Sequence, residues 1–358
     1  MKLSKMIAVI LLMAILLTAG AYFYQQTKTN NISSPPTPGL TVFLPEREVS
    51  ALLFDGEKLW VGTSDGILLL DPQSGELLRE LDTGIRLIYS AGICQTVDGL
   101  VWVGHETGVT VFQNGQVIAS ISAPRIPGGR INTVVPAPEN GIWLGAPEGA
   151  ARITLVGGEL QVAQTLWTGN GLAEDFVNVI HIRPDGELWF GAYLASEKGG
   201  LSIHNSDGWR YFSTDDGLPH RFVTAILPVG EEILIGTGHL DRGGLALLIE
   251  NDGEWTIKKT YHIDDGLPGE KIRQLYRATD GTLWITTESD GLIVCPSPVS
   301  LKQPGLPGLR LKRENGLSDN EIKVIVETES FYWLGGRYGL TRVERKAIWD
   351  DEQFKSMT

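Results

Sequence analysis

The chain has 358 residues, of which 43 are glycine, 10 are tryptophan and 42% are hydrophobic. This composition is typical of a folded, turn-rich protein and excludes an intrinsically disordered chain. The net charge is −13, and the densest basic segment is the short stretch RVERK at 342–346. A nucleic acid is therefore not an expected partner, because nucleic-acid binding needs a basic surface.

The first 24 residues form a predicted targeting segment. Lys2 and Lys5 precede an apolar run from Met6 to Tyr24 that only Thr18 interrupts. This run is about long enough to span a bilayer, so it predicts either a cleaved signal peptide or a retained membrane anchor helix. We expect residues 25–39 to form a flexible linker. The rest of the chain should then lie outside the cytoplasm, periplasmic or at the cell surface, and should meet the membrane only through this segment.

A tryptophan-bearing strand recurs seven times. Its central residues are Trp60, Trp102, Trp143, Trp189, Leu234, Trp284 and Trp333. Successive positions differ by 42, 41, 46, 45, 50 and 49 residues. A period of this length, with strands and no helical pattern, is typical of propeller blades. The sequence therefore predicts an all-β, seven-bladed β-propeller over residues 40–346, followed by a tail at 347–358.

Turns and connecting loops follow the same period. An Asp-Gly or Asn-Gly pair, such as Asp55-Gly56 or Asp280-Gly281, precedes most copies of the tryptophan strand, as two-residue hairpin turns require. The loop leading into the first strand of a copy starts at a glycine followed by Leu or Ile. These glycines are Gly84, Gly171, Gly217, Gly266 and Gly316, and nine positions later each copy has an apolar strand residue. A constant loop length implies the same connection between every pair of neighbouring blades.

The ring must also close, because an open last blade would leave an unpaired strand edge. The last copy supplies three strands, near 322–326, 331–334 and 340–343. We expect the segment from Leu40 to Leu44 to complete this seventh blade. The alternative is that Ile348-Trp349 does so. Cys94 and Cys295 fall in blades two and six, which are not neighbours, so we expect two buried free thiols and no disulfide.

The repeats resemble the two-component regulator propeller repeat family. The resemblance is carried by Gly-Leu-Pro at 217–219 and 266–268, by NGLSDNEIKVI at 315–325, and by the Asp-Gly, Leu-Trp and Gly-Leu pattern at 185–191 and 280–292. It implies a ligand-sensing propeller of the kind found outside the membrane in bacterial hybrid sensor kinases. About a dozen residues follow the last repeat, so we expect no kinase, receiver or DNA-binding domain in this chain, and signalling would need a partner protein.

Two loops between the second and third strands are longer than the others. The step from Trp189 to Gly200 is eleven positions and the step from Leu234 to Gly244 is ten, whereas three other copies advance six. Because blades four and five are adjacent, we expect these loops to form one raised wall beside a binding surface. Neutral surface insertions are the alternative. The candidate residues of this wall are Tyr193, Glu197, Lys198, His220, Arg221, His239, Asp241 and Arg242.

Three further residues are expected near the mouth of the ring. His105 takes a position that is threonine in other copies, and Arg337 and Tyr338 occupy the corresponding loop of the last blade. His105 could equally be a surface histidine with satisfied hydrogen bonds. A metal held by His220, His239 and Glu197 is geometrically possible but not expected, and we predict no cofactor and no catalytic residue.

These observations favour a non-catalytic extracytoplasmic binding or sensor propeller that recognises a small ligand, a glycan or an envelope protein. Two alternatives remain. One is a metal-dependent lyase or hydrolase on the same face, as in the streptogramin lyases, although the sequence lacks their WFTE-type repeat. The other is a structural scaffold of an envelope complex. Function has to be decided from the site, because one fold serves many functions.

Overall fold

The computed structural model describes residues 37–87, 92–138, 140–194 and 199–349. The predicted signal or anchor segment and nearly all of the predicted linker lie outside these residues, as do Glu197 and Lys198. Within the described ranges, no helix is long and apolar enough to cross a membrane.

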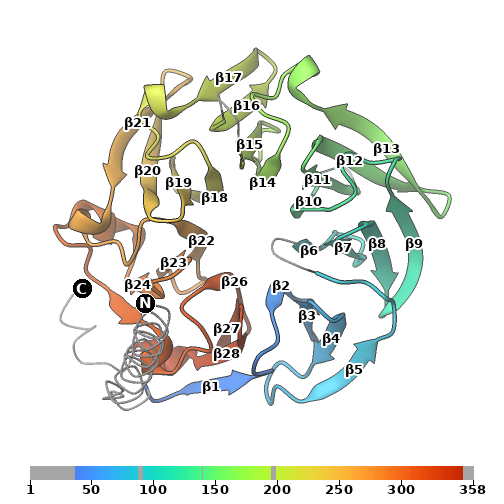
Figure 1. Cartoon of the computed structure of the whole chain (residues 1–358), viewed down its shortest axis with the longest axis horizontal. Helices are drawn as coiled ribbons and strands as arrows, with labels where there is room; N and C mark the ends of the chain where they lie inside the picture. The colour runs from blue at the N-terminus through green and yellow to red at the C-terminus, as the bar shows by residue number, and fades with distance from the viewer. Residues whose placement is uncertain (1–36, 88–91, 139, 195–198, 350–358) are drawn as a thin grey trace, which may run out of the picture. The chain divides into compact units, whose positions relative to one another are not determined.

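Seven four-stranded antiparallel sheets form a closed ring, and the first strand of each sheet lies innermost (Figure 1). The prediction of a seven-bladed propeller is therefore confirmed. The innermost strands, in the order of blades one to seven, are β2 (Val49–Phe54), β6 (Gly92–Gln95), β10 (Thr133–Pro136), β14 (Val177–Ile182), β18 (Val223–Val229), β22 (Ile272–Arg277) and β26 (Ile322–Glu327). The second strands are β3 (Leu59–Thr63), β7 (Val101–His105), β11 (Ile142–Ala146), β15 (Leu188–Ala192), β19 (Glu232–His239), β23 (Leu283–Thr287) and β27 (Phe331–Gly336).

The remaining strands complete each sheet toward the outside. The third strands are β4 (Ile67–Leu70), β8 (Gly108–Gln113), β12 (Gly149–Val156), β16 (Leu201–Asn205), β20 (Arg242–Asn251), β24 (Leu292–Cys295) and β28 (Gly339–Glu344). The outer strands of blades one to six are β5 (Leu77–Leu81), β9 (Gln116–Ser122), β13 (Glu159–Leu166), β17 (Gly208–Phe212), β21 (Glu254–Tyr261) and β25 (Leu309–Leu311). A separate 3₁₀ turn, η4 (Pro298–Lys302), lies between β24 and β25.

In blades one, four and six, the repeated tryptophan ties the second strand to the turn that precedes it. The indole nitrogen of Trp60 donates a hydrogen bond to Asp55 (2.7 Å), that of Trp189 to Glu187 (2.7 Å) and that of Trp284 to Thr282 (3.1 Å). The ring itself is buried in each case. A large aromatic side chain thus fills the space between two sheets while its one polar atom keeps a partner, as a buried indole requires.

The loop glycines end short 3₁₀ helices that lead into the next blade. These helices are η1 (Thr168–Asn170), η2 (Thr214–Asp216), η3 (Ile263–Asp265) and η5 (Arg313–Asn315). Each is followed by a glycine with φ between 102° and 135°. Only glycine adopts such angles without strain, so the glycine fixes where the chain turns inward.

The N-terminal strand closes the ring. β1 (Leu40–Phe43) pairs antiparallel with β28, placing Leu40 opposite Val343 and Phe43 opposite Leu340, and it lies on the outer edge of blade seven (Figure 1). The predicted closure is therefore confirmed. Ile348 and Trp349 instead belong to the short helix α2 (Arg345–Trp349), and the Ile348 side chain is fully buried against blades six and seven.

Candidate ligand-binding site at the mouth of the ring

In the six blades where these positions are described, the mouth of the ring is built from two residues per blade, both at or just before the start of the innermost strand. In each blade we identify the first-strand residue that pairs with the last Gly or Thr of the tryptophan motif, such as Ala51 opposite Gly62 or Gln274 opposite Thr286. The residue immediately before this paired residue and the residue two positions before that one lie on the same side of the strand. Positions 89 and 91 of blade two lie outside the described residues.

Two rings of side chains result. The neck ring, immediately before the paired residue, consists of Ser50, Asn132, Asn178, Thr224, Arg273 and Lys323. The mouth ring, two positions earlier, consists of Glu48, Arg130, Phe176, Phe222, Lys271 and Glu321. The scaffold positions around them repeat from blade to blade, but these two positions differ in chemistry in nearly every blade.

A β-bulge at the same place in five blades explains why the neck residues face inward. The strand register skips one residue at Ser50, Asn178, Thr224, Arg273 and Lys323. A bulge leaves the extra residue out of the ladder and re-aims its side chain, and bulges recur beside functional sites. In five blades, therefore, the strand pairing is interrupted at the residue that belongs to the neck ring.

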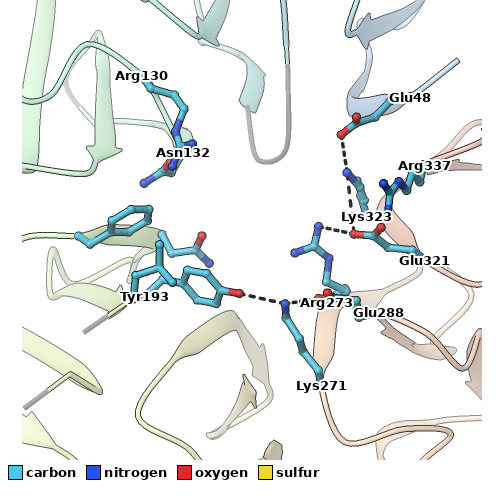
Figure 2. Close-up of a pocket in the computed structure, with 13 residues that line it drawn as sticks. Glu48, Arg130, Asn132, Tyr193, Lys271, Arg273, Glu288, Glu321, Lys323 and Arg337 are labelled. Carbon is cyan, nitrogen blue, oxygen red and sulfur yellow. Dashed lines mark hydrogen bonds and ion pairs between the residues drawn. The ribbon is translucent and has the colours of Figure 1, made fainter. Parts of the chain in front are cut away.

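Residues of the two rings from blades one, three, four, six and seven line a cavity of about 470 Å³. Figure 2 shows Arg130, Asn132 and Tyr193 on one side of it, facing a group of charged residues from blades one, six and seven. Phe176 and Tyr193 supply the aromatic surface, with ring centroids 6.1 Å apart. A wall of this kind, with aromatic faces and many hydrogen-bonding groups, suits a small polar ligand.

The charged residues form linked ion pairs. Arg273 lies 2.7 Å from Glu321, and Lys323 contacts Glu48 and lies 3.8 Å from Glu321 (Figure 2). Lys271 pairs with Glu288 and also donates a hydrogen bond of 2.9 Å to the Tyr193 hydroxyl. The Lys271 and Lys323 side chains are only 6% exposed, so these pairs hold their geometry better than surface pairs do.

A second cavity of about 250 Å³ is lined in part by the same neck residues. It shares Asn132, Asn178, Arg273 and Lys323 with the mouth cavity. The amide nitrogens of both asparagines donate to a main-chain oxygen of the following blade, Val177 at 2.8 Å and Val223 at 3.3 Å. Two other lining residues, Thr224 and Gln274, each have a side-chain oxygen, Oγ1 and Oε1 respectively, that is buried without a hydrogen-bond partner.

The predicted wall of blades four and five comes together around Tyr193. Its ring lies 5.0 Å from Phe222 and 6.5 Å from His239, and His220 stacks 6.4 Å from His239. Desolvation, together with the positive charges of the neighbouring His239 and Arg221, lowers the pKa of His220. Tyr193 lines the mouth cavity, whereas the histidines lie behind it.

The other predicted wall residues are less central. The long β19–β20 connection is an extension of both strands, with His239 paired to Arg242 across a turn at Leu240 and Asp241. Arg221 lies 5.5 Å from the Phe222 ring, and it does not line the cavity. Within the described residues, no group of three His, Cys, Asp or Glu could hold a metal ion. Glu197, the third residue of the possible metal set, lies outside them.

Of the three residues predicted near the mouth, Arg337 lines the cavity, whereas His105 and Tyr338 do not. Arg337 lines the mouth cavity, and Tyr338 beside it is 45% exposed without lining it. His105 is 7% exposed and its ring lies 3.1 Å from Thr110 and 3.2 Å from Thr107, and burial lowers its pKa to about 4. It is a buried, hydrogen-bonded histidine that does not line the cavity.

Sequence reasoning missed most of the lining. The residues it did not single out are Glu48, Arg130, Asn132, Phe176, Asn178, Lys271, Arg273, Glu288, Glu321 and Lys323. The available signal was the loop register: counting from each loop glycine, the fifth and seventh residues are the mouth and neck positions. The sequence comparison stopped at the ninth, apolar residue, which repeats, and passed over the two that vary.

Comparison with known proteins agrees with this architecture. A family model described as "Two component regulator propeller" matches residues 266–289, from the loop glycine of blade six to the end of its tryptophan strand. Blade six is therefore similar to a two component regulator propeller repeat over these residues. No curated protein matches the sequence of the propeller.

Solved structures share the ring. The extracellular domain of a putative hybrid two component system from B. thetaiotaomicron matches with a TM-score of 0.69 and 19% identity, covering 91% of this chain and 42% of that one. The extracellular domain of a putative one component system from the same organism matches with a TM-score of 0.62 and 20% identity, covering 86% and 40%. Virginiamycin B lyase from Staphylococcus aureus matches with a TM-score of 0.61 and 14% identity, covering 85% and 98%. The propeller thus spans about two fifths of the length of the two extracellular domains.

Proposed function

We propose that the propeller is a non-catalytic binding module that works outside the cytoplasm and captures a small polar ligand at the mouth of the ring. The observation that carries this proposal is the mouth cavity itself, which is lined by residues at or just before the start of the innermost strands of blades one, three, four, six and seven. The scaffold repeats while these side chains differ, which is how a symmetric fold gives an asymmetric ligand site.

The comparisons support the location and the sensory role. Two solved relatives of the ring are extracellular domains of putative hybrid two component and one component systems. In the propeller, the ion pairs at the mouth link blades one, six and seven, and Tyr193 links blade four to blade six. A ligand seated among them would bridge segments far apart in the chain, so binding would stiffen the ring as a whole.

The test is a thermal-shift screen of the purified propeller against neutral sugars, sugar acids, amino acids and dicarboxylates. A compound at one hundred times its Kd stabilises by about 2.7 kcal/mol, which raises the melting temperature by about 4 °C for a domain of this size. The variant Tyr193→Ala should lose the shift because it removes the aromatic wall and the partner of Lys271.

Tyr211→Ala is the matched control. Tyr211 is 49% exposed on the outer strand β17 and does not line the mouth cavity, so this variant should keep the shift. The stabilising compound should also be recovered chemically unchanged after prolonged incubation. A compound that stabilised wild type and Tyr193→Ala equally, or that was converted, would refute the proposal.

A further inference from the structure

The distribution of charge within the site is uneven. Among the described residues lining the mouth cavity there are five cations, namely Arg130, Lys271, Arg273, Lys323 and Arg337, and three carboxylates, namely Glu48, Glu288 and Glu321. The difference, five minus three, leaves an excess of two positive charges in a chain whose net charge is −13. A positive concavity on an acidic protein concentrates anions locally.

The carboxylates all lie outside the neck ring. Glu48 and Glu321 belong to the mouth ring and Glu288 follows β23. The six described neck residues comprise two cations, two amides and two hydroxyls and no acid. Hydrogen-bond donors and cations are the groups that hold a carboxylate, sulfate or phosphate, and the two neck cations, Arg273 and Lys323, also contact Glu321 and Glu48 of the mouth ring.

A second observation also points to a bound group at this level. Thr224 and Gln274 are among the residues that line the deeper cavity, and their side-chain oxygens, Oγ1 and Oε1, are buried with no hydrogen-bond partner in the protein. Leaving a buried polar group unpaired costs about 1–3 kcal/mol, so such atoms are normally satisfied by water or by a ligand. Thr224 is a neck residue at one of the five bulges, next to the Arg273 position of blade six.

We propose that the neck ring is an anion site, and that the ligand of the propeller is a small molecule with an anionic group held by Arg273, Lys323 and Thr224. Its body fills the mouth cavity against Phe176 and Tyr193. This inference rests on the proposed function and adds the ligand class. Arg273 and Lys323 already contact carboxylates of the mouth ring, so the incoming anion shares these cations with Glu321 and Glu48.

The experiment is calorimetric titration at low ionic strength with matched pairs of compounds that differ in one charged group. The pairs are D-glucuronate with D-glucose, and 4-hydroxybenzoate with 4-hydroxybenzyl alcohol, and sodium sulfate serves as the simplest anion. The acid of at least one pair should bind at least about tenfold more tightly than its neutral partner, because a charge at contact distance from two cations interacts strongly at a partly buried site. Binding of sulfate alone would still support an anion site and would identify an inorganic ion as its occupant.

Thr224→Asp and Thr224→Asn separate charge from shape at the neck. The aspartate should weaken binding of the acid at least about tenfold more than the asparagine does, because the two side chains are similar in size and only the aspartate carboxylate competes for Arg273. Lys302→Gln, an exposed change at η4, removes one positive charge away from the site and should leave binding unchanged.

The outcomes distinguish this inference from the proposed function. Equal binding of the acids and their neutral partners, with no difference between Thr224→Asp and Thr224→Asn, would overturn the anion site and leave the mouth as a binding site for neutral compounds. No binding of any anion to wild type would also overturn it. The proposed function fails separately, if no compound of the broader thermal-shift screen depends on Tyr193.

Discussion

At the scale of single residues, His105 shows how one blade departs from the repeat without forming a site. The threonines at the same position of blades one, five and six donate to a glycine oxygen three to seven residues ahead, at 2.9–3.0 Å. His105 instead bonds Thr110 and Thr107, and burial lowers its pKa to about 4 from 6.5. The protein thus buries a neutral imidazole that costs free energy to protonate.

This burial predicts a pH dependence. Between pH 6.5 and about 4 the unfolded state binds more protons at His105, so the free energy of unfolding should fall by up to roughly 3 kcal/mol as pH drops through that window, and should not change on this account above pH 6.5. His105→Thr, which restores the threonine of other blades, should lose this part of the pH dependence. Chemical unfolding at pH 4.5 and pH 7.5 measures it. Burial also lowers the pKa of His181, but that contribution is common to both proteins and cancels in the comparison. Equal pH slopes in wild type and variant would contradict the assignment.

The two cysteines should be unreactive toward thiol reagents in the native protein. Cys94 and Cys295 are buried and free, and desolvation raises the pKa of each thiol to about 12. Since the thiolate is the reactive form, neither should react with a thiol reagent at pH 8 until the ring unfolds, and both should react in denaturant. Rapid labelling of the native protein would show that one of these blades opens far more often than its burial implies.

At the scale of elements, the stability of the closed ring depends on the closing strand β1. β1 covers the edge of β28, and Phe43 packs 5.3 Å from Trp333 while Arg342 lies 5.3 Å from the Phe43 ring. Helix α2 adds a second clamp, because Arg345 lies 3.5 Å from Asp280 and 3.4 Å from Glu327. These contacts hold blade seven against blade six as well as closing it.

Deleting residues 38–44 should therefore cost more than about 3 kcal/mol of stability, since it removes the Phe43 packing and exposes the edge of β28. Thermal unfolding and size-exclusion chromatography should show a lower melting temperature and self-association. Val42→Thr is the control, because Val42 is 44% exposed and the change should cost under about 1 kcal/mol. A deletion variant that stayed monomeric with an unchanged melting temperature would mean that α2 alone suffices for closure.

The elements were predictable because their signals are local. The tryptophan strand, the Asp-Gly turns and the loop glycines each reflect chemistry within a few residues, so the sequence yields the blade count and the closing strand. The bulges were not predictable, because whether the strand register skips Thr224 or Arg273 depends on how the first strand of the blade pairs with the second. The neck residues lie at those bulges and were not predicted, and of the described residues of the predicted wall only Tyr193 lines the mouth cavity.

At the scale of the whole molecule, the site exists only in the closed ring. Lys323 and Glu48 are 275 residues apart in sequence and meet across the seam between blades seven and one. Their pairing needs the same closure that β1 provides. This explains why no local pattern in the sequence indicates the pair, and the proposed ligand binding would depend on the integrity of the ring.

Hydrogen exchange tests whether a ligand binds at the mouth of the ring. Amide exchange would be measured by mass spectrometry with and without the compound that most stabilises the propeller in the thermal-shift screen. The account predicts slower exchange at residues 171–178, 266–273 and 316–323, which lead into the innermost strands, and little change in the outer strands β5, β9 and β17. Protection confined to the outer strands, or none at the mouth, would contradict it.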